Sequence, residues 1–471
     1  MKATSKSELL GKAPVSSLML KFAIPSIVAM LVGALYNIVD QLFIGQAVGE
    51  LGNAATNIAF PLTTSCIALS LLFGIGGASC FNLAMGMGKK ARAAYFVGNS
   101  ITLLIVCGIM LCIFTQLNLT PLLTGFGAPT EVLPYAEEYV RITAFGFPFL
   151  LLTTGGTNII RADSSPNIAM GCNIIGAIIN TVLDAVFVMG MDMGMGGAAL
   201  ATVIGQAVSG LIVIAYMFQF RTVKLKFKHF LIGWKHSVKI ISIGMGSFIN
   251  QVAMMSTQIV LNNLLRHYGA LSIYGESTPI ACAGIVMKVA QVFFSVIIGI
   301  AQGTQPIVSY NYGAANYKRV RDVYKLALIS GGSLSVIVAV VFQVFPREII
   351  ACFGSGSELY FEFGVRFFRI FLMLTALNFM QPITTTFFTS IGKPGKGAFL
   401  SLSRQIIYLL PSLIILPLIF KIDGILYAGP IADSLAMITT SIMIASEFKS
   451  MSKLEKLQNN LETKQEDKNG I

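Results

Sequence analysis

The chain has few charged residues for its length. Of its 471 residues only 11% are Asp, Glu, Lys or Arg, whereas 55% are hydrophobic, and the mean hydropathy is +0.76. A soluble globular protein usually has about a quarter of its residues charged, so this composition excludes a soluble protein. Histidine is also scarce, and all three histidines fall in predicted loops, which argues against a buried histidine relay.

Cysteine is limited to seven residues, an odd number, and most of them lie inside apolar stretches without the spacing of a metal site. They are Cys66, Cys80, Cys107, Cys112, Cys172, Cys282 and Cys352. We therefore expect them to be packing residues, and we expect neither a structural metal nor an organic cofactor.

Long apolar stretches make up most of the chain, each with roughly the 20 residues that a helix needs to cross a bilayer. The first is too long for the core of a signal peptide. The sequence therefore predicts an all-α polytopic membrane protein. Its twelve transmembrane helices are expected near residues 18–44, 54–84, 95–117, 135–160, 167–190, 196–219, 238–264, 280–308, 324–345, 363–390, 397–420 and 425–446.

The net charge of +12 is distributed by loop rather than gathered in one patch, so it does not indicate nucleic-acid binding. Sixteen basic residues lie in alternate loops, whereas the loops between them hold only Arg266, Arg347 and Lys421. By the positive-inside rule both termini are expected in the cytoplasm. The sixteen are Lys89, Lys90, Arg92, Arg161, Arg221, Lys224, Lys226, Lys228, Lys235, Lys239, Lys318, Arg319, Arg321, Lys325, Lys393 and Lys396.

The two halves of the chain are weakly repeated. Gly74 and Gly88 correspond to Gly299 and Gly313, and Pro166 corresponds to Pro394, at offsets of 225 to 228 residues. Such parallel repeats usually form two lobes with a substrate site at their interface. We predict an N-lobe over residues 1–219, a basic cytoplasmic linker over 220–239, a C-lobe over 240–446 and a charged cytoplasmic tail over 447–471.

Two aspartates are isolated within apolar helices of the first half. Asp40 is the only ionisable residue between Phe22 and Gly49, and Asp184 is the only one between Asn167 and Met191. A carboxylate at that depth costs several kcal/mol and usually marks an ion or proton pathway. The pair therefore indicates a coupled transporter.

Helical rise places further polar residues at the same depth. Asp184 lies nine residues before the turn near Met193, Thr202 lies nine after it, and Asn180 shares a helix face with Asp184. Carboxylate, amide and hydroxyl oxygens in one layer suit either Na⁺, at Asp184, Asn180 and Thr202, or a proton on a buried carboxyl group. Alternatively, Asn180 and Thr202 only bond to backbone or to each other.

The second half carries different charges. Lys288 and Asp433 are predicted at one depth and are expected to form a neutralising pair, since unpaired buried ions are costly. Arg404 lies eight residues from the cytoplasmic Lys396, so its side chain is expected to extend toward that surface.

Taken together, several segments resemble the MATE family of multidrug and toxic compound extrusion transporters over about residues 15–446. They are YNIVD (36–40), the loop after Arg161, NTVLD (180–184) and GGAALAT (196–202). The resemblance implies two six-helix lobes in a V shape that export cationic amphipathic compounds in exchange for H⁺ or Na⁺. It also implies a cation-coupling site at Asp40, Asn180, Asp184 and Thr202, with Tyr36 and Asn158 nearby, and bending of the first helix at Pro25. Because helices seven and ten lack a buried acid, the chain looks closer to the DinF-like branch.

We therefore predict a monomeric multi-pass protein of the cytoplasmic membrane that exports cationic amphipaths and is not an enzyme, with H⁺ favoured as the coupling ion and Na⁺ as the alternative. A lipid-linked precursor flippase of the same superfamily is the second hypothesis, but it needs more cationic cavity residues than Lys288 and Arg404 supply. A membrane-embedded transferase is the third, but the loops show no catalytic cluster.

Overall fold

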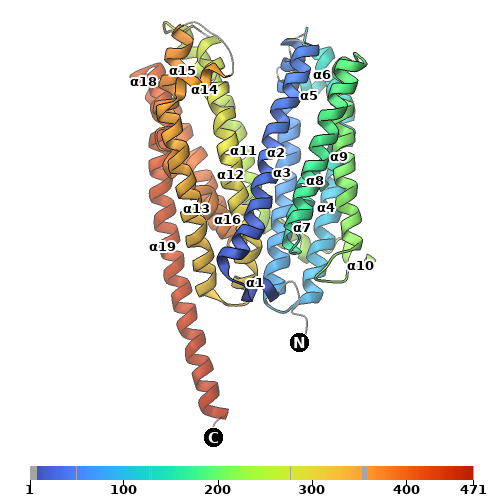
Figure 1. Cartoon of the computed structure of the whole chain (residues 1–471), viewed down its shortest axis with the longest axis vertical. Coiled ribbons are helices and arrows are strands. Elements are labelled where there is room, and N and C mark those ends of the chain that lie inside the picture. Colours follow the sequence, from blue (N-terminus) through green and yellow to red (C-terminus); the bar gives the residue numbers. More distant parts are fainter. Residues whose placement is uncertain are drawn as a thin grey trace.

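The helices form two bundles that stand side by side (Figure 1). The computed structural model describes residues 8–48, 50–126, 128, 130–275, 277–352 and 358–469, and within them it has helices and no strand. After a short α1 (Glu8–Lys12), the N-lobe contains α2 (Val15–Ala47), α3 (Glu50–Gly86), α4 (Lys90–Leu117), α5 (Leu119–Gly125), α6 (Leu133–Thr143), α7 (Phe147–Ala162), α8 (Pro166–Asp184) and α9 (Gly194–Phe218).

The C-lobe follows the short α10 (Phe227–Phe230). It contains α11 (Trp234–Ala270), α12 (Ser277–Gly313), α13 (Tyr317–Val344), α14 (Pro346–Ala351), α15 (Glu358–Phe371), α16 (Met380–Ser390), α17 (Pro394–Leu402), α18 (Leu410–Phe420) and α19 (Ile422–Asn469). In the described residues ten helices are long and apolar enough to span a membrane, and α15 with α16, bent by 42°, makes an eleventh. The predicted fourth span corresponds to α6 and α7. The prediction of an all-α membrane protein with twelve spans in two lobes is confirmed.

Corresponding spans of the two lobes carry similar irregularities. The fourth span of each lobe is interrupted by a 3₁₀ turn, at Ala144–Gly146 and at Thr375–Leu377. The fifth contains a π-helical segment, at the end of the span in the N-lobe (Ala185–Gly190) and in its middle in the C-lobe (Ser403–Leu409). Pro148 and Pro411 lie in the first turn after two of these breaks, and a proline lacks the N–H that would bond one turn back. These shared breaks support the internal repeat.

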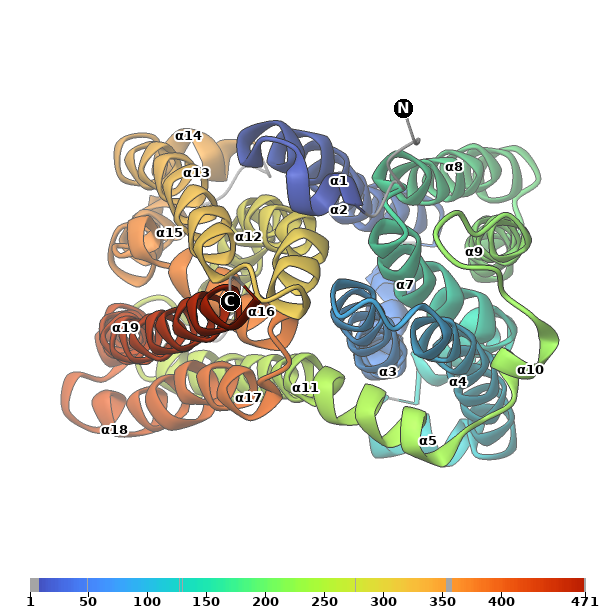
Figure 2. The same cartoon turned by 90° about the horizontal axis from the view of Figure 1, so that it is seen from below.

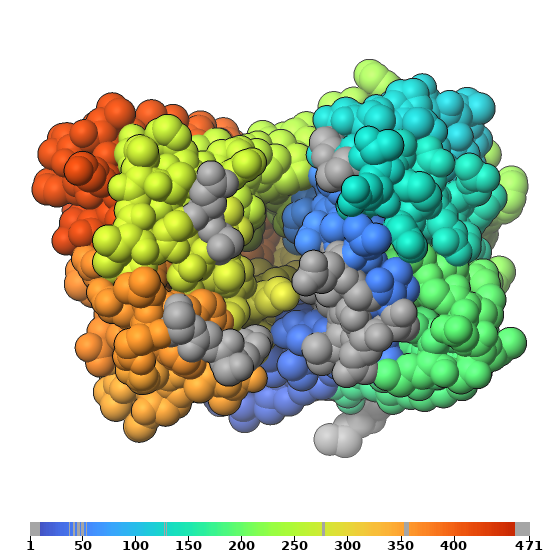
Figure 3. Space-filling model, turned by 90° about the horizontal axis from the view of Figure 1, so that it is seen from above, coloured from blue at the N-terminus to red at the C-terminus, as the bar shows by residue number. Residues whose placement is uncertain are grey.

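The lobes touch at one end and diverge at the other. We call the end with α1 and the last turns of α19 the terminus end, and the opposite end the open end (Figure 1). At the terminus end, glycines bring backbones together across the seam between the lobes. A Cβ on Gly86 would lie 2.1 Å from the Tyr310 carbonyl oxygen, and one on Gly313 would lie 2.4 Å from that of Leu83. At the open end the surface is hollowed between the lobes (Figure 3).

Two helices belong to both lobes. The start of α2, including Leu18 and Phe22, is buried in the C-lobe core, whereas Ile44 near its end is buried in the N-lobe core. Conversely, Ile240 at the start of α11 lies in the N-lobe core and Leu265 near its end lies in the C-lobe core. Pro25 lies in α2 within the part that packs in the C-lobe, since Ile27 also contacts that core. Viewed from the terminus end, α2 and α11 lie on opposite edges of the seam (Figure 2).

The basic linker is docked on the N-lobe. The buried Asp163 carboxylate accepts hydrogen bonds from the backbone N–H groups of Arg221 (2.7 Å) and Thr222 (3.0 Å) and from the Tyr216 hydroxyl (2.7 Å). Burial raises the pKa of Asp163 above its ordinary value, and these hydrogen bonds oppose the rise. Asn99 binds the linker further along, since its amide nitrogen donates to the His229 carbonyl at 3.0 Å.

The predicted tail is continuous with the last span. Residues 447–469 are the end of α19, whose final turns extend beyond the bundle (Figure 1), and residues 470 and 471 lie outside the described part. Glu447 has a fully buried side chain held by Lys393 and Lys396, with a distance of 2.6 Å from Lys396, so the first turn of the predicted tail is part of the C-lobe.

Candidate functional site

The two isolated aspartates meet inside the N-lobe. Asp40 comes from α2 and Asp184 is the last residue of α8; they are 9% and 0% exposed, respectively. Their carboxyl groups face each other closely enough for a hydrogen bond when one of them carries a proton. Two carboxyl groups in contact and away from water do not readily both ionise. The pair is therefore suited to holding a proton or another cation.

Several oxygens of this cluster have no hydrogen-bond donor among the described residues. They are one carboxyl oxygen of Asp40, both of Asp184 and the amide oxygen of Asn180. Buried oxygen acceptors are nearly always satisfied in proteins, and four of them in one place are unfavourable without a positive partner. The donor set, two carboxyl groups and an amide oxygen, fits a proton or a hard cation such as Na⁺.

Polar residues of three helices surround the acids. The Asn180 amide nitrogen donates to the Thr202 hydroxyl on α9 at 3.3 Å. Gly205, one turn after Thr202, permits this approach, because a Cβ there would lie 2.8 Å from the Gly176 carbonyl oxygen of α8. The Tyr36 hydroxyl also contacts Thr202. The structure thus brings together five of the predicted site residues: Asp40, Asp184, Asn180, Thr202 and Tyr36.

Sequence analysis missed a sixth member, Tyr139 of α6. Its side chain contacts Thr202 and lies within electrostatic range of Asp40 and Asp184. The signal available was weak, because Tyr139 follows two glutamates in a helix of mixed composition, although Ala136, Val140 and Thr143 mark its buried face.

The backbone is irregular directly after Asp184. The π-helical segment Ala185–Gly190 follows at once, and the Met191 N–H reaches back to the Val186 carbonyl oxygen at 2.9 Å. Such π-bulges in α-helices are frequently found at functional sites.

Asn158 is engaged elsewhere. Its side chain donates to the Thr154 carbonyl oxygen at 2.9 Å and accepts from Arg161 at 2.9 Å. Arg161, which is 2% exposed, also donates across the seam to Gln302 of α12 at 3.0 Å. Asn158 therefore supports a contact between the lobes, and its predicted contact with the acid pair is not seen.

The predicted pair of Lys288 and Asp433 is wrong. Asp433 instead pairs with Arg404, with 2.8 Å between nitrogen and oxygen, and their side chains are 1% and 17% exposed. Lys288 is exposed. The expectation that Arg404 extends to the cytoplasmic surface is wrong for the same reason, since counting residues fixes the depth of a side chain but not its direction around the helix.

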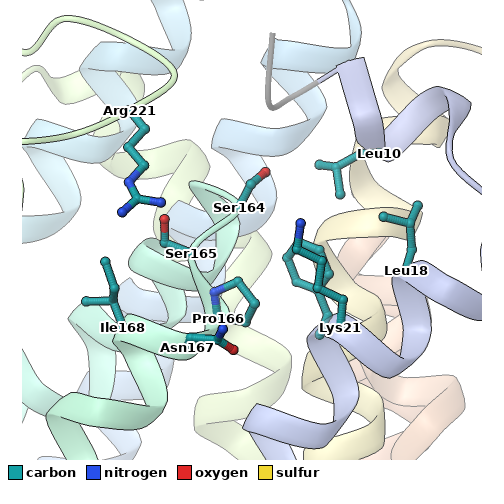
Figure 4. A pocket seen from close by; sticks show the side chains of 10 residues that line it. Leu10, Leu18, Lys21, Ser164, Ser165, Pro166, Asn167, Ile168 and Arg221 are labelled. Atoms are coloured by element: carbon teal, nitrogen blue, oxygen red, sulfur yellow. The ribbon is translucent and has the colours of Figure 1, made fainter. Parts of the chain in front are cut away.

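A separate pocket of about 270 Å³ lies at the terminus end (Figure 4). Lys21 and Leu18 of α2 line one side, and Ser165 and Arg221 line the other. None of the predicted coupling residues lines it, so it is distinct from the acid cluster.

Two six-helix lobes, a buried acid cluster in one of them and a cleft that opens between them define a polytopic membrane transporter of the parallel-repeat class. A family model described as MatE matches residues 25–186 and 247–414, and the chain belongs to this family. The resemblance to MATE transporters noted in the sequence is confirmed, whereas the DinF-like branch stays a prediction.

Curated relatives cover almost the whole chain. The multidrug export protein MepA of Staphylococcus aureus (strain MSSA476) is 25% identical over 434 residues, which are 92% of this chain and 94% of the relative. MepA of Staphylococcus haemolyticus (strain JCSC1435) is 25% identical over 431 residues, 91% of this chain and 93% of that protein.

Solved structures share the fold. One is described as the outward-facing conformation of a multidrug resistance MATE family transporter of the MOP superfamily, with 22% identity and a TM-score of 0.89. Another is a MOP superfamily transporter from Pyrococcus furiosus, with 21% identity and a TM-score of 0.89. Each match covers 96% of this chain and 100% of the other chain.

Proposed function

We propose that this protein is a secondary active exporter of amphipathic drugs, many of them cationic, driven by inward movement of H⁺. The observation that carries the proposal is the Asp40 and Asp184 pair, whose buried oxygens have no donor among the described residues. Membership of the MatE family and the similarity to MepA, a multidrug export protein, support drugs as the exported compounds.

The terminus end is assigned to the cytoplasm, because the basic loops that follow α3, α12 and α16 lie there. The open end then faces outward, and the protein is a monomer in the cytoplasmic membrane. Protonation of the pair removes its charge from the N-lobe interior and allows α2 to shift against α8. Since α2 also packs in the C-lobe core below Pro25, a shift at Asp40 is carried to the seam.

H⁺ is preferred to Na⁺ because the two carboxyl groups face each other, an arrangement in which one shared proton relieves repulsion. Na⁺ remains the alternative because Asn180 and Thr202 add further oxygens. The C-lobe ion pair is assigned a structural role, since Arg404 already neutralises Asp433. A lipid-linked precursor flippase is disfavoured by the scarcity of cations in the cleft.

The test is transport in proteoliposomes with pH and Na⁺ gradients imposed separately. A pH gradient in Na⁺-free vesicles is expected to drive export of ethidium, and Asp40→Asn and Asp184→Asn are each expected to abolish it. As a control, the neutralising double variant Arg404→Met with Asp433→Leu keeps proton-driven export, because apolar residues replace both charges. Ethidium export by either aspartate variant at the normal rate would exclude the proposed site. Strict Na⁺ dependence would identify Na⁺ as the coupling ion and would leave the proposal of an exporter unchanged.

A further inference from the structure

One face of α12 packs on the N-lobe near the terminus end and is exposed toward the open end. A Cβ on Gly299 or Gly303 would lie 2.6 Å from the Ile27 Cα or 2.5 Å from the Ala23 Cα of α2. Continuing outward along α12 at spacings of three or four residues, the same face carries the half-buried Ser295 and then Gln291, Lys288 and Gly284, which are exposed. The lobes diverge here (Figure 3), so this face forms a wall of the cleft.

The two walls of the cleft differ in chemistry. The α12 wall is polar, and α11 extends it, because Gln251, Gln258 and Asn262 continue the face on which Gly244 meets the N-lobe. The Gln258 amide donates to Asn262 at 3.1 Å. On α2, by contrast, the face that begins with Ala23 and Ile27 continues as Leu31, Ala34 and Ile38, which are all apolar.

Lys288 lies on the α12 face that is turned toward this apolar wall. It lies eleven residues outward from Gly299, and Ile38 lies eleven residues outward from Ile27, so both are about 17 Å from the same contact. In the part of the chain that the structure describes, no acid pairs with Lys288. Asp40 lies only two residues beyond Ile38, but its carboxyl group points into the N-lobe toward Asp184.

We propose that Lys288 binds an anionic group of the transported compound, so that the cleft accepts amphipaths with a carboxylate beside an apolar body. This inference rests on the proposed export function. It extends the expected substrates from simple cations to zwitterions. An ammonium group on an otherwise neutral polar wall favours a carboxylate, and the apolar α2 wall contacts the body of the same molecule.

A matched pair of dyes tests the assignment. Tetramethylrhodamine carries a free carboxylate, and its methyl ester is the same chromophore without it. Binding to the purified full-length protein is measured by fluorescence anisotropy at pH 7.5 for the wild type, Lys288→Met and Lys288→Arg. Lys318→Met, in an exposed position at the terminus end, is the control.

Lys288→Met is expected to weaken binding of the carboxylate dye about tenfold, the equivalent of one charge-assisted hydrogen bond, and to change binding of the ester less than about twofold. Lys288→Arg and Lys318→Met are expected to keep the wild-type preference. An equal effect of Lys288→Met on both dyes, or none on either, would overturn the inference while leaving export intact. Failure of the wild type to bind either dye would count against both the inference and the proposed function.

Discussion

Closure of the seam between the lobes requires the absence of a side chain at Gly86, and Gly86→Ala tests this requirement. A Cβ at this position would lie 2.1 Å from the Tyr310 carbonyl oxygen and 2.8 Å from the Ala314 backbone nitrogen. Real Cβ atoms essentially never come within 3.0 Å of a neighbour, so α3 and α12 must separate by at least 0.9 Å. The obstructing atoms are backbone and cannot turn aside.

This separation destabilises only the state in which the lobes are closed at the terminus end. Overpacking of a tight interface costs about 1–3 kcal/mol, and a state that is open at the terminus end relieves it. The population ratio of the two states is then expected to shift toward that open state by about 5- to 150-fold. The rate of export is expected to fall as well, since a transporter held in one state does not cycle.

The measurement is the distance between spin labels at Lys90 and Lys318, which are exposed on the N-lobe and C-lobe sides of the terminus end. Gly86→Ala is expected to add a population at longer distance. Gly171→Ala is the control, because it gains the same helix propensity, about 1 kcal/mol, and its Cβ meets nothing within 4 Å. Indistinguishable distance distributions in the two variants would refute the reasoning.

Two further predictions concern stability. Glu447→Gln leaves Lys393 and Lys396 facing each other without their buried carboxylate, and it is expected to lower the free energy of unfolding by about 2–3 kcal/mol, the lysines being partly exposed. Both this variant and Glu455→Gln are measured by thermal unfolding in detergent. Glu455 is more exposed than Glu447 and pairs with Arg321, so Glu455→Gln is expected to cost less than about 1 kcal/mol. Equal losses in the two variants would contradict the burial argument. Burial, together with Lys228 and Lys226, lowers the pKa of His229 below 6.5, and its Nδ1 accepts the Lys226 backbone N–H, as only a neutral ring can. The docked linker is therefore stabilised above pH 6.5 and loses that stabilisation as the pH falls through the lowered pKa of His229. Trypsin cleavage of the linker is expected to accelerate at pH 5 relative to cleavage of the His229→Gln variant. A rate ratio independent of pH would refute this.

The acid cluster could be predicted from the sequence because helices have a fixed rise. Counting from the turn near Met193 placed Asp184 and Thr202 in one layer, and the structure brings them together with Asn180. Their role in coupling stays a prediction. Depth alone does not give the direction of a side chain around its helix. Lys288 and Asp433 were therefore paired wrongly, because Asp433 pairs with Arg404 and Lys288 is exposed.

The twelve spans could also be predicted, but not their breaks. Pro148 and Pro411 were visible in the sequence, yet whether a proline kinks a helix or only begins its next segment depends on packing partners. The sharing of α2 and α11 between the lobes could not be read from the repeat either, since a repeat matches whole helices and does not say which core each half of a helix packs against.

The shared helices limit how the lobes can move. The chain passes from one lobe core to the other along α2, between Ile27 and Ile44, and along α11, between Phe248 and Leu261. The linker is fastened to the N-lobe by Asp163 and Asn99. The two crossings lie on opposite edges of the seam (Figure 2). Two fixed points define a line, and a rigid lobe held at both of them keeps a single rotational degree of freedom about that line. Rotation about this line is therefore the allowed motion of the lobes, whereas the covalent connections alone suppress sliding and twisting.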